Sequence, residues 1–336
     1  MDSKNKLSRR SFIKITAVAG GVLLGGKLLL GLADDSRVTV RETRALMGTI
    51  INLAVIAENK PAGEHAVAAA FIELERLVSI FTHRTPDSPV TILNAAGKLA
   101  SPPKELVALL AQAVAISEIT NGAFDVTIKP LVDLYQQSQP KLPPEHKVQE
   151  ALGFVGYKKL NVSAEQIIFS QEGMAITLDG IAKGAIVDAG VAELKKLGYP
   201  NVFVEAGGDL VASGLKETGT PWNVGVQSPR QEQAGLVASF KVSDRAVATS
   251  GDYMQYYSPD LTHHHILDSQ TGYSPLEVAS ATVVAPTCLQ ADALATAVTV
   301  LGISAGLEKI NRLPNADALL VTKDLTEYRS RGFNYR

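Results

Sequence analysis

Cysteine is nearly absent from this sequence, since Cys288 is the only one among 336 residues. A single cysteine excludes an intramolecular disulfide framework and a zinc site built from several thiolates. Basic residues show no surplus either, because 32 lysines and arginines stand against 34 aspartates and glutamates. Beyond the N-terminal region the sequence has no Lys/Arg-rich stripe of the kind that binds nucleic-acid phosphates. We therefore expect no nucleic-acid partner and no disulfide-stabilised scaffold.

The basic residues that exist are concentrated at the start of the chain. Residues 1–33 contain six basic side chains and one acidic one, which leaves 26 basic and 33 acidic residues in 34–336 and a net charge of −7 for that part. The basic start includes the pair Arg9-Arg10 and is followed by a Gly-rich apolar run from Ile15 to Leu32. A basic region, an apolar region and small residues at the exit are the parts of an export signal.

The residues next to the arginine pair favour export by the twin-arginine route. Phe12 and Lys14 follow the pair, which is typical of a twin-arginine signal. A transmembrane anchor is the alternative, although glycines and Lys27 interrupt the apolar run. We predict a twin-arginine-type export signal over 1–33 and one domain over 34–336, located in the periplasm or elsewhere outside the cytoplasm. An uncleaved signal would also associate the protein with the inner membrane.

The rest of the chain mixes strands and helices without regular alternation, which predicts an α+β fold rather than a doubly wound sheet. Its composition, 46% hydrophobic and 20% charged, is that of a globular protein. Strands are expected where β-branched apolar residues cluster, and helices where apolar residues recur at helical spacing. The expected strands are 49–57, 201–205, 222–226, 236–242, 246–249, 263–267, 280–285, 316–323 and 326–333, with short ones near 159–178. The expected helices are 61–81, 101–119, 182–197, 288–301 and 303–311.

Glycine and polar residues gather at the ends of several of these elements. The segment from Leu178 to Gly184 opens a helix, where glycine lets the backbone approach a ligand and the helix N-terminus attracts phosphate. A strand-to-helix turn capped by Asp179 is the simpler interpretation of the same residues. The segment from Glu205 to Asp209 likewise fits an anion-binding nest or an ordinary hairpin turn. Neither motif decides the function by itself.

A carboxylate and a hydroxyl lie side by side on the helix expected over 288–301. Asp292 and Thr296 occupy positions i and i+4 and therefore share a face. Their neighbours are apolar, so this face is expected to point inward, where a buried aspartate needs a partner. Oxygen donors of this kind suit Mg²⁺, whereas a solvated helix face is the alternative.

Three adjacent histidines, His263, His264 and His265, suggest either a metal site or proton transfer. Side chains alternate between the faces of a strand, so at most His263 and His265 would point the same way. The chain has neither an HExxH motif nor a cysteine cluster, which disfavours zinc. A general base fits better, because the imidazole pKa suits proton abstraction near neutral pH.

Taken together, eight motifs in order resemble the ApbE family of flavin transferases, from about residue 43 to residue 333. Each motif is weak alone, whereas all eight in the same order are specific. They are Met47-Gly48-Thr49, Leu93-Asn94, Gly122-Ala123-Phe124-Asp125, Asp179 to Gly184, Gly207-Gly208-Asp209, Thr249 to Tyr253, His265 to Asp268 with Thr271-Gly272, and Ala291 to Thr296.

The resemblance implies a Mg²⁺-dependent FAD:protein FMN transferase, which cleaves FAD, attaches FMN to a threonine or serine hydroxyl of an acceptor flavoprotein and releases AMP. It also implies mixed sheets with flanking helices and a flavin nucleotide bound between the motif loops. The implied FAD contacts are Met47, Phe81, Ala123, Phe124, Asp125, Thr177, Lys183 and Ile266. The implied Mg²⁺ ligands are Gly180, Asp292 and Thr296, and the implied catalytic residues are His265 as the base and Asp252 near the pyrophosphate.

Two other functions fit the same residues. If water replaces the acceptor, the site becomes an FAD pyrophosphatase that yields FMN and AMP. An exported flavin-binding carrier would bind FAD without turnover. In each case a domain of net charge −7 must offset its own charge locally to bind an anionic nucleotide. Mg²⁺, Lys183 and the helix N-terminus at Gly180–Gly184 are therefore requirements of the site.

Overall fold

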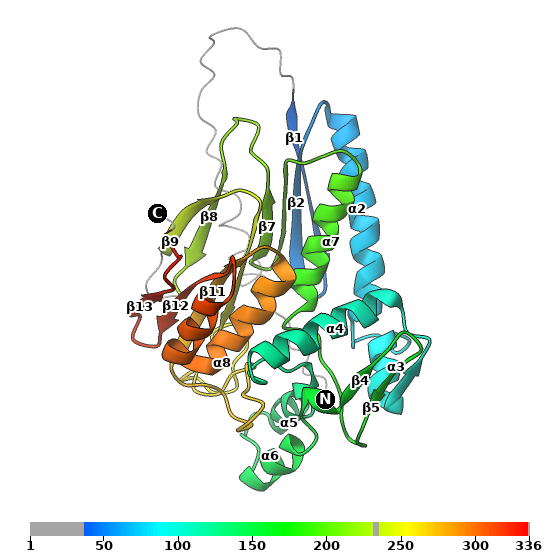
Figure 1. The fold of residues 1–336 in the computed structure, drawn as a ribbon, viewed down its shortest axis with the longest axis vertical. Helices are drawn as coiled ribbons and strands as arrows, with labels where there is room; N and C mark the ends of the chain where they lie inside the picture. Colours follow the sequence, from blue (N-terminus) through cyan, green and yellow to red (C-terminus); the bar gives the residue numbers. More distant parts are fainter. Residues whose placement is uncertain (1–36, 231–234, 335–336) are drawn as a thin grey trace.

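The computed structural model describes residues 37–230 and 235–334 (Figure 1). The predicted export signal over 1–33 lies outside these residues. The described residues belong to the domain predicted over 34–336.

An eight-stranded sheet forms the centre of the domain, and every neighbouring pair of its strands is antiparallel. The order across the sheet is β1-β2-β6-β7-β10-β11-β12-β13. The strands are β1 (Val38–Leu46), β2 (Thr49–Ala57), β6 (Val202–Ala206), β7 (Asp209–Ser213), β10 (Arg245–Gly251), β11 (Val278–Ala285), β12 (Asp317–Thr322) and β13 (Glu327–Arg329).

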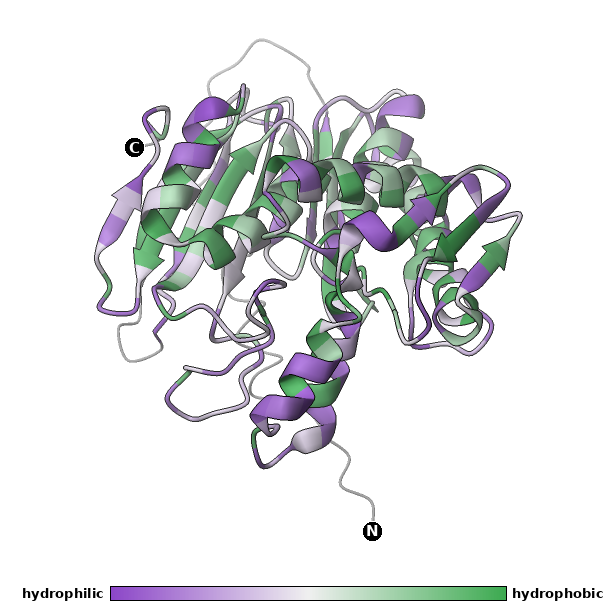
Figure 2. Cartoon of the chain, turned by 60° about the horizontal axis from the view of Figure 1, so that its bottom comes forward, coloured by the Kyte–Doolittle hydropathy of each residue, from purple (hydrophilic) through white to green (hydrophobic). Residues whose placement is uncertain are grey.

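Both faces of this sheet are covered. Helices α2 (Lys60–Phe81), α7 (Ala182–Lys196) and α8 (Cys288–Arg312) pack on one face (Figure 1). The hairpin of β8 (Trp222–Gln227) and β9 (Leu236–Val242) covers the other. Strand β2 shows the alternation that this requires, since Leu53 belongs to the helix-side core and Ala54 to the core beneath the hairpin. Figure 2 shows the result, largely hydrophobic strands next to helices whose outer faces are hydrophilic.

Smaller elements extend the domain beyond the end of α2. The helices are α3 (Pro89–Ala96), α4 (Lys104–Ile119), α5 (Lys129–Ser138) and α6 (Glu145–Leu152), with the short 3₁₀ turns η1 (Val126–Ile128) and η2 (Tyr157–Lys159). A three-stranded sheet in the order β3-β5-β4 is formed by β3 (Lys98–Ala100), β5 (Gln166–Phe169) and β4 (Leu160–Val162). The predicted α+β class is confirmed.

Helix α8 is bent in its middle. Gly302 leaves the helical conformation with φ 77° and ψ −175°. The two helices predicted over 288–301 and 303–311 are therefore the two halves of one bent helix. The carboxylate of Glu277 accepts a hydrogen bond of 2.9 Å from the Ile303 N–H, which begins the second half. Within the described residues, α8 is the one helix that is long and apolar enough to cross a membrane, but 61% of its apolar window is buried inside the protein. It packs as a core helix against β10 and β11.

One predicted strand is wrong. Residues 263–267 form no strand, and their only bridge is an isolated one between Tyr256 and His264. Polar side chains, instead of a neighbouring strand, accept hydrogen bonds from the backbone here. The His263 N–H donates to the Ser258 hydroxyl and the His264 N–H donates to the Ser274 hydroxyl. We call the irregular segment 252–277, between β10 and β11, the histidine loop.

Candidate active site

Two tight hairpin turns meet at one end of the sheet. Met47 and Gly48, between β1 and β2, both have positive φ, as do Gly207 and Gly208 between β6 and β7. Two-residue hairpins need this backbone, because its twist matches that of the strands. The Gly207 N–H donates to the Ile50 carbonyl at 3.1 Å, so the two turns lie side by side. The segment from Glu205 to Asp209 is thus a hairpin turn, the simpler of its two interpretations.

Lys183, on the first turn of α7, lies among buried carboxylates. Its ammonium contacts the carboxylate of Asp209 and is 3.7 Å from Oδ1 of Asp292. Glu205 is also buried, and accepts hydrogen bonds from the Asn52 amide at 2.5 Å and the Gly208 N–H at 2.6 Å. Burial raises the pKa of Glu205 and of Asp292, and the charge of Lys183 opposes both rises. Lys183 therefore balances part of the negative charge of this acidic cluster.

The starts of α7 and α8 are in direct backbone contact. A Cβ atom at Gly184 would lie 2.3 Å from the carbonyl oxygen of Cys288, so only glycine allows this approach. The Gly184 N–H donates to Oδ2 of Asp292 at 3.1 Å. Asp188, one turn further along α7, accepts the N–H groups of Cys288 at 2.8 Å and Leu289 at 2.9 Å. These hydrogen bonds fix the position of the Asp292 side chain relative to the start of α7.

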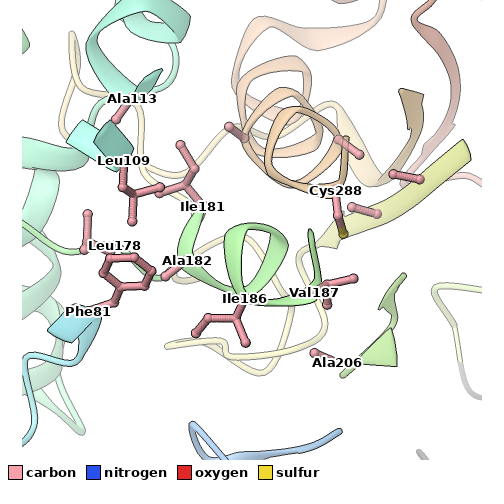
Figure 3. Packing of buried hydrophobic residues seen from close by; sticks show 14 of the residues in the cluster. Phe81, Leu109, Ala113, Leu178, Ile181, Ala182, Ile186, Val187, Ala206 and Cys288 are labelled. Atoms are coloured by element: carbon pink, nitrogen blue, oxygen red, sulfur yellow. The ribbon is translucent and has the colours of Figure 1, made fainter. Parts of the chain in front are cut away.

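Burial dominates the chemistry of this helix contact. It raises the pKa of Asp188 to about 6, although the two backbone hydrogen bonds oppose the rise. It also raises the pKa of the Cys288 thiol, which makes a reactive thiolate unfavourable. Figure 3 shows Cys288 beside Val187 in the packed core, so this cysteine serves packing.

Gly180, Thr296 and Asp292 come together as expected for a hard-cation site. A Cβ atom at Gly180 would lie 3.3 Å from the Thr296 hydroxyl and 3.4 Å from the ring of Phe124. Thr296 is also 3.2 Å from the Ser250 hydroxyl. Asp292 is buried, so the predicted inward face is confirmed. The described residues contain no group of three or more histidines, cysteines or acids that could hold a metal. A metal here would rely on one carboxylate, neutral oxygens and ligand oxygens, a donor set that fits Mg²⁺.

The three histidines differ sharply in their surroundings. The Nδ1 of His265 is 3.0 Å from the Gln255 carbonyl, to which it must donate, so Nε2 is the acceptor of the neutral ring. Burial lowers the pKa of His265, and the charges of Lys183 and Asp179 also act on that pKa, which places this ring near the start of α7. His264 is fully buried, its Nε2 is 3.1 Å from the Pro275 carbonyl, and burial lowers its pKa to about 4. His263 instead meets the Thr262 hydroxyl at 2.9 Å.

Asp252 has both carboxylate oxygens in ion pairs. Arg230 binds them in a two-point arrangement at 2.8 and 2.9 Å, and the Lys323 ammonium is 2.9 Å from Oδ2. The side chain of Asp252 is fully buried. A contact of this carboxylate with a pyrophosphate, as expected from the resemblance, would bring a second anionic group next to the two cations that hold it. That role of Asp252 stays a prediction, and its observed contacts are structural.

The predicted nucleotide contacts lie in the core and around one polar cavity. Phe81, Ala123, Phe124 and Ile266 are buried, and Met47 packs partly buried against the main core. The carboxylate of Asp125 is used internally, accepting the Thr127 N–H, the Thr127 hydroxyl and the Tyr157 N–H at 2.6 to 2.8 Å. Thr177 lines a cavity of about 210 Å³, whose other lining residues are His83, Arg84, Lys129, Val132, Asp133, Gln136, Asp179 and Gln255.

This cavity contains charged residues that the sequence did not single out. Arg84 is exposed and 3.6 Å from Asp179, and Lys129 is paired with Asp133 at 2.7 Å. Asp179 itself does not cap α7, because Ile181 is the N-cap residue and makes no side-chain hydrogen bond. The simpler interpretation of Asp179 as a helix cap is therefore wrong. No local pattern marks Arg84, because its partner Asp179 is distant in the chain.

A comparison with known families identifies the chain. The model of the ApbE family matches residues 47–320. The chain belongs to the ApbE family. Among its relatives is the FAD:protein FMN transferase of Vibrio cholerae, 28% identical over 93% of this chain and 97% of that protein. The protein of the same name from Treponema pallidum is 30% identical over 88% of this chain and 89% of its own length.

Solved structures agree with this assignment. The ApbE protein of Thermotoga maritima superposes with a TM-score of 0.81 at 29% identity, covering 88% of this chain and 98% of that one. The flavinyl transferase ApbE of Pseudomonas stutzeri, in its apo form, gives a TM-score of 0.80 at 26% identity, covering 89% and 96%. The ApbE-like fold predicted from the eight motifs is confirmed. The roles of individual site residues stay predictions.

Proposed function

We propose that this ApbE-family protein is an FAD:protein FMN transferase that works outside the cytoplasm. The observation that carries the proposal is the cluster formed where α7 and α8 begin. Lys183, Asp292 and Thr296 converge there beside Gly180, within electrostatic reach of His265. Relatives that match nearly the full length of the chain bear the name of this activity.

The donor atoms fit a bound Mg²⁺. The carboxylate of Asp292, the hydroxyl of Thr296 and the carbonyl of Gly180 would hold it, and the ion would neutralise charge on the FAD pyrophosphate. Lys183 adds a second positive charge, which FAD would draw away from Asp209 and Asp292. Without these charges, the buried acids at this site would repel an anionic nucleotide.

His265 has the geometry of the general base. Its Nδ1 is engaged by the Gln255 carbonyl, which leaves Nε2 to accept the proton of an acceptor threonine or serine. The acceptor oxygen then forms a bond to the FMN phosphorus, and the bond from that phosphorus to the bridging oxygen breaks. AMP leaves with the bridging oxygen. The lowered pKa of His265 keeps the ring neutral, and thus able to accept a proton, at neutral pH.

The test combines the purified mature domain with FAD, Mg²⁺ and an acceptor flavoprotein domain. We expect the acceptor to gain the mass of an FMN moiety, which is FMN less one water, and AMP to appear in equal amount. AMP release at full rate without acceptor would instead support a pyrophosphatase. Tight FAD binding with no AMP under any condition would support a carrier, and either result would reject the transferase.

The location outside the cytoplasm has a separate test. Fusing residues 1–33 to a reporter should send it across the inner membrane in folded form, and replacing Arg9 and Arg10 by lysine should stop this export. Export of the lysine variant at the original rate would reject the twin-arginine route. Size comparison of the exported protein then shows whether the signal is cleaved or anchors it to the membrane.

A further inference from the structure

Lys323 connects three parts of the chain that are distant in sequence. It follows the end of β12, and its ammonium is 2.9 Å from the buried Asp252 carboxylate at the start of the histidine loop. The same ammonium donates to the carbonyl of Leu261, inside that loop, at 2.8 Å. The backbone N–H of Lys323 donates to the carbonyl of Glu277, at the end of the loop, at 3.2 Å. One residue therefore contacts the start, the middle and the end of the histidine loop.

The contact in the middle of the loop falls on a strained residue. Leu261 has φ 60°, a left-handed conformation that a bulky side chain rarely adopts. Such a backbone persists only where its surroundings hold it. Besides the bond from Lys323, Leu261 makes one backbone hydrogen bond, from its N–H to the Ser258 carbonyl at 3.0 Å. The ammonium of Lys323 is thus a main support of this conformation.

The strained residue immediately precedes the histidines. After Leu261, the backbone runs through His263, whose carbonyl accepts the Tyr257 N–H at 2.6 Å, to His265, whose N–H donates to the Gln255 carbonyl at 3.0 Å. The His265 ring bonds to the same Gln255 carbonyl. A change in the backbone at Leu261 would pass through these backbone hydrogen bonds to the His265 ring, because all their donors and acceptors lie within the histidine loop.

We propose that Lys323 is a positioning residue for His265, which it serves by tying the strained backbone at Leu261 to the buried Asp252. The proposal rests on the proposed function in one respect, the role of His265 in transfer. Asp252 acts in this account as the anchor. Arg230 holds the anchor independently, with two bonds of its own. Lys323 can therefore be removed without leaving the Asp252 charge unpaired, and the fold should survive its loss.

The test uses Lys323→Met, which keeps the aliphatic stem and removes the ammonium. Lys323→Arg is the conservative variant, because a guanidinium can bridge a carboxylate and a carbonyl. Lys241→Met is the matched control, since Lys241 is exposed on β9 and makes no ion pair among the described residues. Hydrogen exchange of backbone amides and steady-state FMN transfer are measured for all four proteins.

For Lys323→Met, we expect amide exchange over 257–265 to rise about tenfold, while exchange in α7 stays unchanged. We also expect kcat for transfer to fall about tenfold or more, because small misplacements of a catalytic group are costly, with KM for FAD changed less than twofold. Lys323→Arg should restore most of the slow amide exchange over 257–265 and most of kcat. Lys241→Met should match the wild type in both measurements.

Three results would overturn the proposal. They are unchanged exchange in the loop of Lys323→Met, raised exchange with unchanged kcat, and a fall in kcat that Lys323→Arg does not reverse. If the wild type itself transfers no FMN, the proposed function fails, and the exchange measurement alone still decides whether Lys323 holds the loop.

Discussion

Replacing Gly184 by alanine tests whether the close contact between α7 and α8 builds the active site. The new Cβ would meet three backbone atoms, the Cys288 oxygen at 2.3 Å, the Cys288 carbonyl carbon at 2.5 Å and the Leu289 nitrogen at 2.7 Å. Backbone atoms cannot rotate away as side chains do. The two helices would therefore have to separate by about 1 Å to restore ordinary contact.

Two opposing effects set the size of the change. Alanine favours a helix over glycine by at most about 1 kcal/mol. Against this, overpacking costs about 1–3 kcal/mol, and the separation stretches the hydrogen bonds that Asp188 accepts from Cys288 and Leu289. Bonds to a charged group contribute about 1.5–3 kcal/mol each, and partial loss of both adds to the cost. We expect a net loss of about 3 kcal/mol in the free energy of unfolding.

Urea denaturation of the mature domain measures this change, with Gly190→Ala as the matched control in the same helix. The Cβ of that variant would meet only side-chain ends, Leu74 Cδ1 at 3.0 Å and Val204 Cγ1 at 3.3 Å. We expect its stability to stay within about 1 kcal/mol of the wild type. FMN transfer should fall in Gly184→Ala and persist in Gly190→Ala. Equal stability changes in the two variants would refute the close-packing argument.

Three further predictions concern single side chains of the site. Asp292→Asn should raise the Mg²⁺ concentration needed for half-maximal transfer at least about 100-fold, as measured by metal titration, and an unchanged titration would remove Asp292 from the metal site. His265→Ala should still bind FAD but lose about 10²–10⁴-fold in transfer, and the wild-type rate should rise as pH climbs through the lowered pKa of His265 and then level off. Unchanged transfer by that variant would assign the base to His263 or His264. The depressed pKa of His264, about 4 against 6.5, means that its contribution to stability is complete above pH 6.5 and is lost as pH falls toward 4. Because of this group, urea denaturation should give a free energy of unfolding about 2.5 kcal/mol lower at pH 4.5 than at pH 7. His264→Gln should lack this part of the pH dependence. A pH dependence identical to that of the wild type would contradict the prediction.

Several elements could be predicted from the sequence because local pattern and tertiary environment agree. The strands Thr49–Ala57 and Leu236–Val242 have the predicted bounds. Helix α2 begins at Lys60, one residue before its predicted start, because Asn59 caps it. In each of these segments, the period of the apolar residues matches the face that is buried.

Elements whose form depends on distant partners were missed. Strands β1 and β7 and helices α3, α5 and α6 were not predicted, and β1 is a sheet edge with mixed polar and apolar residues. Residues 263–267 of the histidine loop were predicted as a strand, but hydrogen bonds from the N–H groups of His263 and His264 to the hydroxyls of Ser258 and Ser274 decide their path.

Within the site, the sequence could predict the local geometry but not the partners. The i, i+4 spacing of Asp292 and Thr296 placed them on one inward face, and the structure confirms this for the buried Asp292. The ion pairs of Asp252 join it to Arg230 and Lys323, which are 22 and 71 positions away in the chain, and no local pattern marks such a pairing. The same is true of the contact between Gly184 and Cys288, which only the packing of two helices creates.

Helix α8 has a consequence for how the protein must be made. Folded, it is two buried segments that meet at Gly302, and neither segment reaches the length of about 20 residues that spans a bilayer. In the unfolded chain, an 18-residue window of the same helix, with a mean hydropathy of 1.5, would be exposed, and it has the length and composition that can enter a membrane. If the chain is exported, as its N-terminal residues predict, folding before transport would hide this stretch inside the protein.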